Sequence, residues 1–394
     1  MKGRLRPLDY LVWAQSVPGE ARWDLTASGV PDACGPGSLH HRTADGEATP
    51  GPGWPLGVEL SLSELTRRDQ RPELVAAFLE VIGERYGVDP QCVVPTLGAS
   101  QAITQVLFTL ARPGDHVIVE RPTFEPLHGV PEMLGLNVSR LERKIEERWE
   151  PLADRLARLL TPKTRAVILS SLHNPSGVAL TTSTLMAIGE MAARVGAVVL
   201  VDEVYLDFAF DASGETYPWR PACVAIENGV SWSSVTKAFG FAALRAGWVV
   251  ARDRETAQAF RSASHYFHVD PPLASLALAT EVMRHASELA AMAETAIAPS
   301  RAVIDRWIDG ESRVAWVPPS AGQTGLVRLP DLTADLEFAR HLRDRYGTQV
   351  VPGTMFEAPG AVRVSFNLPP AELEQALATV SAALDDFEAR RAVS

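Results

Sequence analysis

One lysine in this sequence stands where a plain positive charge would serve little purpose. Only four of the 37 basic residues are lysines, and Lys237 lies in the run SWSSVTKAFGFAALRAGW with no other basic residue before Arg245. A lysine amine can lose its proton in a suitable environment and attack a carbonyl, which an arginine cannot do. Lys237 is therefore a candidate for a residue that forms a Schiff base.

Two polar residues flank this lysine along the chain. Ser234 precedes it by three residues, and Arg245 follows it by eight. A hydroxyl and a guanidinium beside an imine-forming amine suit a carbonyl compound that carries a phosphate. Pyridoxal phosphate is the candidate that this set of groups favours. Taken alone, a turn rich in serine and threonine, with the stem of a lysine buried beneath it, would show the same pattern.

Acidic residues end a strongly apolar stretch upstream. The sequence AVVLVDE (197–203) predicts a strand buried on both faces, and Asp202 and Glu203 close it. A carboxylate there is costly unless it is paired, and a pyridinium nitrogen would pair with Asp202. Tyr205 follows three residues later and could donate a hydrogen bond to the phenolic oxygen of the same ring. A strand-end aspartate that caps a turn is the alternative.

Two turns offer further groups at predicted strand ends. Asn174 follows the apolar stretch AVILSSL (166–172) within the turn-forming sequence HNPSG. Ala99 and Ser100, in the sequence GAS, open a predicted helix whose free N–H groups and dipole favour a phosphate. Each feature by itself is also consistent with an ordinary turn or helix N-cap.

Together, these motifs resemble those of the fold-type I pyridoxal-phosphate-dependent enzymes, in the class I/II aminotransferase family. They follow that family's order and spacing over nearly the whole chain. The resemblance implies a homodimer with active sites at the subunit interface. It also implies that pyridoxal 5'-phosphate is bound by Ala99, Ser100, Phe124, Asn174, Asp202, Tyr205, Ser234, Lys237 and Arg245.

Three residues enter the candidate site through the resemblance alone. Phe124, in the loop after the predicted strand HVIVE, corresponds to an aromatic residue that stacks on the cofactor ring. Arg363, in AVRVSFN, corresponds to the arginine that holds the substrate α-carboxylate, and Gly29 to a glycine whose backbone lies against the substrate. Asn174 is expected to contact both cofactor and substrate. Without the resemblance, Phe124 would be interpreted as a core residue and Arg363 as a solvent-facing one.

One segment departs from the family pattern. The family usually has a tyrosine, ahead of a Gly-x-x-x-Leu-Arg helix start, that reaches the cofactor phosphate of the partner subunit. The sequence LSLSELTRRDQRPELVAAF (60–78) contains no tyrosine and lacks that glycine, and Leu65 stands near the expected position. Arg67 or Arg68 could make a phosphate or substrate contact instead. This departure is compatible with transamination and also raises the chance of a diverted reaction.

Alternating strands and helices must position the candidate residues. Apolar, β-branched stretches predict strands at 93–97, 116–120, 166–172, 197–203, 230–234 and 246–251. Helices between them imply right-handed crossovers and a mostly parallel sheet sandwiched by helices, which is an α/β fold. Ligands of such sheets bind beyond the carboxyl ends of the strands, where the candidate residues fall.

A smaller α+β domain is predicted after a long, Ala-rich helical pattern that runs from Pro272 to about Trp307. Its predicted strands are 325–329, 349–351 and 362–366, and its predicted helices are 336–346 and 370–389. The predicted organisation has three parts. Residues 1–45 form an N-terminal arm and part of the small domain, residues 46–295 form a large cofactor-binding domain, and residues 296–394 form a small C-terminal domain.

Composition narrows the class of protein. A chain of 394 residues with 46% hydrophobic and 22% charged residues is typical of a soluble globular protein of two domains. A net charge of −11 argues against nucleic acid or an anionic membrane as the main partner, and no apolar run approaches the length of a spanning helix. The widely spaced cysteines, Cys34, Cys92 and Cys223, predict reduced thiols in the cytoplasm and no metal centre.

The sequence therefore predicts an aminotransferase that moves an amino group from an α-amino acid to a 2-oxo acid through a lysine Schiff base. Lys237 would act as the general base, Asp202 would keep the ring nitrogen protonated, and Tyr205 would tune the imine. Two alternatives stay open. One is another pyridoxal-phosphate reaction on the same fold, such as β- or γ-elimination, decarboxylation or cyclisation, and the other is a cofactor-binding regulatory or scaffold protein.

The resemblance also bears on the amino donor. Dicarboxylate-specific relatives take a second arginine from the partner, in the segment after the lysine strand. The corresponding segment here (262–283) contains no Arg or Lys and offers an aromatic and imidazole cluster, HYFH (His265, Tyr266, Phe267 and His268). Because a buried carboxylate without a partner costs several kcal/mol, we expect a neutral or aromatic donor in preference to aspartate. Arg67 or Arg68 could still hold a dicarboxylate.

Overall fold

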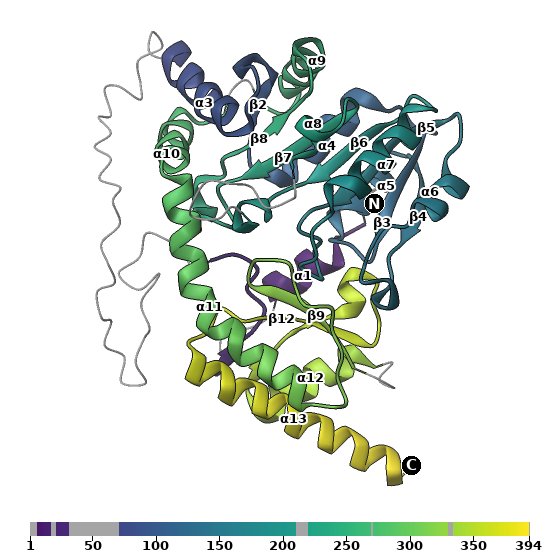
Figure 1. Ribbon diagram of the computed structural model, residues 1–394, viewed down its shortest axis with the longest axis vertical. Coiled ribbons are helices and arrows are strands. Elements are labelled where there is room, and N and C mark those ends of the chain that lie inside the picture. The colour runs from purple at the N-terminus through teal and green to yellow at the C-terminus, as the bar shows by residue number, and fades with distance from the viewer. Residues whose placement is uncertain are drawn as a thin grey trace, which may run out of the picture.

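The computed structural model describes residues 6–16, 21–30, 71–209, 220–268, 271–329 and 334–393. Within these ranges the chain forms a large body around a seven-stranded sheet and a small body around a three-stranded sheet. Figure 1 shows the long helix α11 (Ala286–Gly310) running from one body to the other. The predicted fold class, α/β with a mostly parallel sheet, is confirmed.

The strand order of the large sheet is β2-β8-β7-β6-β5-β3-β4. Its strands are β2 (Val93–Thr96), β3 (His116–Arg121), β4 (Asn137–Glu142), β5 (Thr164–Ser170), β6 (Val198–Asp202), β7 (Gly229–Ser234) and β8 (Gly247–Val250). Only β8 runs antiparallel to its neighbours, β2 and β7. The edge strand β4 was not predicted, because NVSRLE is largely polar and mostly partly exposed.

Alternate residues of the strands face two different helical layers. Val117 and Val119 pack with α4 (Ala99–Leu110), α5 (Pro126–Met133) and α9 (Arg254–Ser264). Ile118, between them, packs on the opposite face with α6 (Ala153–Leu159), α7 (Thr182–Ala193) and α8 (Ala222–Ala225). Because side chains alternate along a strand, a sheet covered on both faces needs continuous apolar strands, as this sequence has.

The long helical pattern after Pro272 is two helices rather than one. The chain leaves helical geometry at His285, between α10 (Leu273–Arg284) and α11. Apolar residues of α10 pack against α3 (Arg71–Tyr86) in the large body. Val303 and Ile304 of α11 belong to the core of the small body. The first turns of α11 still pack on the core of the large body, through Ala286, Leu289 and Ala293, so the change of core falls inside α11 and not at the break.

The small body joins distant parts of the chain. Its sheet has the order β11-β12-β9, with β9 (Thr324–Arg328), β11 (Val351–Pro352) and β12 (Ala361–Ser365) all antiparallel. The helices α12 (Asp335–Tyr346) and α13 (Pro370–Val393) complete its core. The N-terminal strand β1 (Trp23–Asp24) pairs with β10 (Thr348–Gln349), and α1 (Asp9–Ser16) lies between the two bodies (Figure 1).

The predicted domain boundaries stay predictions. The boundary at 295/296 falls inside α11, and the boundary at 45/46 lies outside the described residues. Cys92 and Cys223 are free and buried, and Cys34 lies outside the described residues. Over the described parts of the chain, no helix is both long and apolar enough to cross a bilayer.

Candidate active site

A cavity of about 280 Å³ opens at the carboxyl edge of the large sheet. It gathers all of the residues expected to bind a cofactor: Ala99, Ser100, Phe124, Asn174, Asp202, Tyr205, Ser234, Lys237 and Arg245. These residues come from loops and strand ends far apart in sequence. The parallel arrangement of the sheet brings them to one edge.

Strand direction explains how each loop reaches the cavity. Asp202 and Ser234 are the last residues of β6 and β7, and Asn174 follows the end of β5. Strand β8 runs the other way, so the cavity edge is where it begins. Arg245, two residues before β8, therefore reaches the same edge from the opposite end of its strand.

The Lys237 amine lies inside this cavity. Its Nζ donates a hydrogen bond of 2.8 Å to the Oγ of Ser28. Burial lowers the pKa of Lys237, with positive charge on Arg363 and Arg245 acting in the same direction. Tyr10 and Asp202 oppose that effect without overcoming it. The amine is therefore closer to its neutral, nucleophilic form than an exposed lysine would be.

The N-terminus of α4 faces Arg245. Its N-cap, Gly98, has φ of 80° and makes no side-chain capping hydrogen bond. A Cβ at Gly98 would lie 2.7 Å from an outer nitrogen of Arg245, so only glycine allows this approach. Free N–H groups, the helix dipole, a guanidinium and the hydroxyls of Ser100 and Ser234 make this end of the cavity suited to a phosphate.

Asp202 lies at the other end of the cavity. It is 8% exposed, and burial raises the pKa of its carboxyl group to about 7. The N–H of Val204 donates to its Oδ1 at 3.2 Å. Among the described residues, no cation forms an ion pair with Asp202. A buried acid in this state favours a ligand that brings a positive, hydrogen-bonding partner.

Arg363 is buried rather than solvent-facing, as the resemblance implied. It is 1% exposed, and its guanidinium donates to the Oδ1 of Asn174 at 3.0 Å and to the backbone oxygen of Thr26 at 2.9 Å. A third hydrogen bond, of 3.3 Å, reaches the hydroxyl of Tyr10. Arg363 does not itself line the cavity, but it reaches two residues that do, Asn174 and Tyr10.

Gly29 lies directly against the lysine. A Cβ at this position would come within 3.1 Å of the backbone oxygen of Lys237 and 3.2 Å of its side chain. The N–H of Val30 donates to the same Lys237 oxygen at 2.9 Å. Glycine at 29 therefore lets the N-terminal segment close one wall of the cavity.

Two residues of the N-terminal segment were missed by the sequence reasoning. Tyr10 and Ser28 both line the cavity, and both contact a residue that was predicted to be functional. Tyr10 stands in none of the motifs that the sequence analysis singled out, so nothing drew attention to it. Ser28 stands next to Gly29 in the sequence, and that adjacency was the only available signal.

The predicted HYFH cluster is not part of this chain's own cavity. Tyr266 and Phe267 are 79% and 41% exposed and contact Phe108 on the surface. His265 and His268 line a separate groove between α3 and α9. The segment that departs from the family pattern, with Leu65, Arg67 and Arg68, lies outside the described residues.

Comparison with known proteins identifies the class to which this fold and site belong. Residues 60–380 match the family model "Aminotransferase class I and II". This chain belongs to that family, and it is an enzyme of the pyridoxal-phosphate-dependent aminotransferase type. The match covers most of the chain, including every predicted site residue except Gly29.

Individual relatives show how the family varies. The chain is 28% identical to a capreomycidine synthase of Streptomyces vinaceus, over 73% of each chain. It is 29% identical to the arginine–pyruvate transaminase AruH of Pseudomonas aeruginosa, over 76% of this chain and 78% of the relative.

Solved structures agree over nearly the full length. A PLP-dependent aminotransferase from Streptococcus suis superposes with a TM-score of 0.80 at 25% identity, over 98% of this chain and 99% of that one. The PLP-dependent cyclase OrfR superposes with a TM-score of 0.76 at 26% identity, over 97% of each chain.

Proposed function

We propose that this chain transfers an amino group from an α-amino acid to a 2-oxo acid, using pyridoxal 5'-phosphate held at Lys237. The observation that carries the proposal is the buried Lys237 amine, with its lowered pKa, in a cavity between a strand-end acid and a helix N-terminus. Few other chemistries need a buried lysine with a lowered pKa at that position.

The cavity residues fit pyridoxal 5'-phosphate at both ends. Asp202, a buried acid without a cationic partner among the described residues, suits the pyridine nitrogen in its protonated form. The α4 N-terminus with Ser100, Ser234 and Arg245 suits the phosphate, since Gly98 leaves its backbone open to a ligand. When bound, the cofactor would supply an electron sink that makes the substrate Cα–H bond acidic.

Lys237 would move the proton. Its amine is suited to take a proton from the substrate Cα because burial lowers its pKa and so favours the neutral form. Tyr205 would act as a hydrogen-bond donor, since burial raises the pKa of its phenol to about 12 and so keeps its proton in place. Asn174 and Phe124 would orient the ring from the edge and the face.

Arg363 would bind the α-carboxylate. Its guanidinium is buried and already hydrogen-bonded on its outer nitrogens, which fixes its plane. A fixed guanidinium can receive a carboxylate with little loss of side-chain entropy. Gly29 would bring backbone against the substrate on the same side.

We propose a neutral or aromatic amino donor. The walls of the cavity near the N-terminal segment are apolar, with Leu11 and Ala14 on α1 and Pro126 and Leu127 on α5. Such walls favour an apolar side chain, because a carboxylate buried there would lack a partner.

We also propose a homodimer, which the family implies, and a cytoplasmic location, which the reduced thiols support.

The decisive experiment is a half-reaction with the cofactor-loaded protein. Each amino acid in turn should be tested for loss of the cofactor's absorbance band, with the products identified. We expect a keto acid and the aminated cofactor from neutral or aromatic donors. Borohydride reduction and peptide mapping should place the cofactor on Lys237, and a label on Lys144 or Lys163 would refute the assignment. Light scattering would report the oligomeric state.

Cyclisation or another diverted reaction is the second candidate. It is favoured by the similarity to a PLP-dependent cyclase over nearly the full length, at the same level of identity as to an aminotransferase. The product decides between the two reactions, since a diverted reaction returns the cofactor unaminated. Turnover of an amino acid that leaves the cofactor unaminated would therefore select the second candidate.

A further inference from the structure

Ser28 makes the closest polar contact to the lysine amine. Its Oγ accepts a hydrogen bond of 2.8 Å from Lys237 Nζ across a sequence separation of 209 residues. Both side chains line the cavity. The resemblance assigned a role to the neighbouring Gly29 backbone and none to this hydroxyl.

A second partner lies beyond Ser28. Tyr205 also lines the cavity, and the Ser28 hydroxyl lowers the pKa of its phenol against the larger effect of burial. A hydroxyl has one proton to donate and lone pairs to accept with. If that proton is directed to Tyr205, a lone pair of Ser28 is left to face Lys237 Nζ.

The segment that carries Ser28 is held firmly in place. Val30 N–H donates to the backbone oxygen of Lys237 at 2.9 Å, and the side-chain amide of Gln323 donates to the backbone oxygen of Gly29. A Cβ at Gly29 would be 3.2 Å from the side chain of Lys237. The distance between Ser28 and the amine is therefore set by backbone contacts on both sides.

We propose that Ser28 is a positioning residue for the free amine of Lys237, which it holds by accepting from Nζ while donating to Tyr205. This inference rests on the proposed function, in which the amine must move a proton while it is not bound to the cofactor. An amine anchored at one N–H samples fewer orientations within the cavity. Ser28 would therefore act through Lys237 and not on the substrate.

The contact has a measurable consequence for the amine itself. An acceptor stabilises an ammonium more than a neutral amine, so loss of the hydroxyl should lower the pKa of Lys237 further. The difference between charged and neutral hydrogen bonds corresponds to about 0.5–1 pH unit. The other charged or titratable groups acting on Lys237 are Tyr10, Arg363, Asp202 and Arg245, and Ser28→Ala leaves all of them in place.

The test uses the full-length protein after removal of the cofactor. Competitive acetylation with trace isotope-labelled acetic anhydride over a pH range, followed by peptide mapping, gives the pKa of Lys237 separately from the other lysines. In Ser28→Ala it should fall by about 0.5–1 pH unit, and Ser28→Thr should restore it. The matched control is Ser183→Ala, an exposed serine on α7, which should leave it unchanged. An unchanged pKa and reactivity in Ser28→Ala would overturn the proposal.

The role of Tyr205 is tested by a double-mutant cycle. Tyr205→Phe should change the Lys237 pKa in the native background and have little further effect in Ser28→Ala, because the phenol acts through the serine. Equal effects in both backgrounds would overturn that part of the proposal. In the loaded enzyme, Ser28→Ala should lower kcat about 10-fold with little change in KM, as expected for a positioning contact. Failure of every amino acid to react would refute the proposed function, while the acetylation result would still stand.

Discussion

Two adjacent carboxyl groups end the central strand of the large sheet, and burial raises the pKa of both. The pKa of Asp202 rises to about 7 and that of Glu203 to about 8. Their surroundings differ, because Asp202 lines the cavity while Glu203 points away and accepts a 2.7 Å hydrogen bond from the Ala222 N–H. Successive side chains at a strand end point to opposite sides. At the scale of single residues, this leaves Asp202 available to a ligand and gives Glu203 a structural role.

Replacing Asp202 with asparagine tests the cavity acid. The amide keeps the shape and a hydrogen bond but loses the negative charge, so a pyridine nitrogen would no longer be held protonated. We expect the cofactor to stay bound and the half-reaction to slow by about 100-fold or more, as when one electrostatic contact is lost from an active site. Absorbance gives cofactor content, and near-normal turnover would show that another acid does this work.

Replacing Arg245 with alanine tests the phosphate end. The loss of one charge-assisted contact, worth about 1.5–3 kcal/mol, should weaken cofactor affinity about 10- to 100-fold. Equilibrium dialysis or fluorescence titration would measure it. The order of preference among amino donors should not change, because Arg363 and the apolar walls are untouched. Unchanged cofactor affinity would contradict the assignment of Arg245.

Glu203 predicts a pH dependence of stability in the cofactor-free protein. Burial raises its pKa in the folded state from the usual 4.5 to about 8, so the folded state binds this proton more tightly than the unfolded state does. The associated stability is present below about pH 4.5 and is lost as the pH rises to about 8. Glu203→Gln, which stays neutral, should therefore fall less in thermal midpoint between pH 6 and pH 9 than the native protein. Parallel declines would contradict this.

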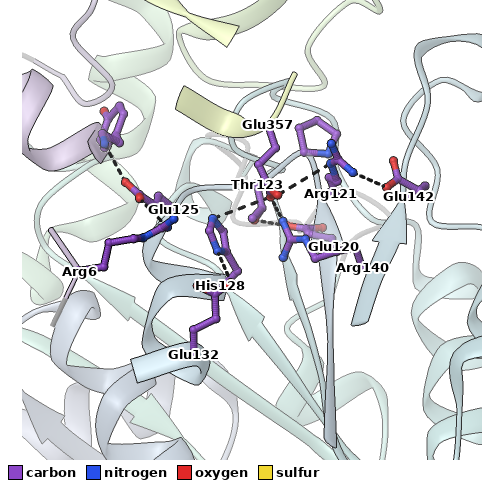
Figure 2. Close-up of polar contacts among 12 residues, drawn as sticks. Arg6, Glu120, Arg121, Thr123, Glu125, His128, Glu132, Arg140, Glu142 and Glu357 are labelled. Carbon is purple, nitrogen blue, oxygen red and sulfur yellow. Dashed lines mark hydrogen bonds and ion pairs between the residues drawn. The ribbon is translucent and has the colours of Figure 1, made fainter. Parts of the chain in front are cut away.

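At the scale of elements, helix α1 depends on polar contacts more than on a core. None of its residues is buried, although Tyr10 and Leu11 line the cavity. Glu125, just after Phe124, accepts from the Tyr10 N–H at 2.7 Å. It also pairs with Arg6 at 3.3 Å (Figure 2). A carboxylate at a helix N-terminus is favourable, so Glu125 ties α1 to the loop that carries Phe124.

Replacing Glu125 with glutamine should loosen α1 without unfolding the protein. The loss of charge weakens the contact with the helix N-terminus and the pair with Arg6, by about 1 kcal/mol in total. Hydrogen exchange at the α1 amides should then be about 5-fold faster, with the large sheet unchanged. Glu132→Gln is the control, because Glu132 contacts His128 and not α1 (Figure 2). Equal exchange rates at the α1 amides in the two variants would show that Glu125 does not hold α1 in place.

At the scale of the whole molecule, a short loop docks the small body onto the large one. It follows the turn η5 (Gly353–Phe356), whose Phe356 oxygen accepts from the Thr123 N–H at 3.0 Å. Glu357 then pairs with Arg140 on β4 and lies 3.8 Å from the Nε2 of His128 (Figure 2). Burial lowers the pKa of Arg140 to about 10, so its charge needs this anion.

Glu357→Gln should destabilise the junction between the bodies. It leaves the largely buried Arg140 without its main counter-ion, which we expect to cost about 1–2 kcal/mol, less than for a fully buried pair. The control is Glu146→Gln, which breaks another pair between the two bodies, with Arg328 at 2.6 Å, in an exposed position. That loss should cost under about 0.5 kcal/mol. Thermal or urea unfolding would compare the two, and equal effects would refute the docking role.

The sequence by itself determined the large sheet and the residues at its carboxyl edge. Continuous Val/Leu stretches are local signals of strands buried on both faces, and the position of Asp202, Asn174 or Ser234 after such a stretch places it at that edge. The site could therefore be assembled from motifs without knowing any distance. The polar edge strand β4 and the break at His285 escaped prediction, because strand pairing and tertiary packing leave no local pattern in the sequence.

Only the tertiary structure decided how the N-terminal segment lines the cavity and how Arg363 of the small body reaches the residues around it. Tyr10 and Ser28 reach Arg363 and Lys237 from 353 and 209 residues away in the sequence. Arg363 itself, in an alternating strand, could have faced either way. Across such a separation, the packing of whole elements decides which side chains meet. The sequence around each residue does not show how those elements pack.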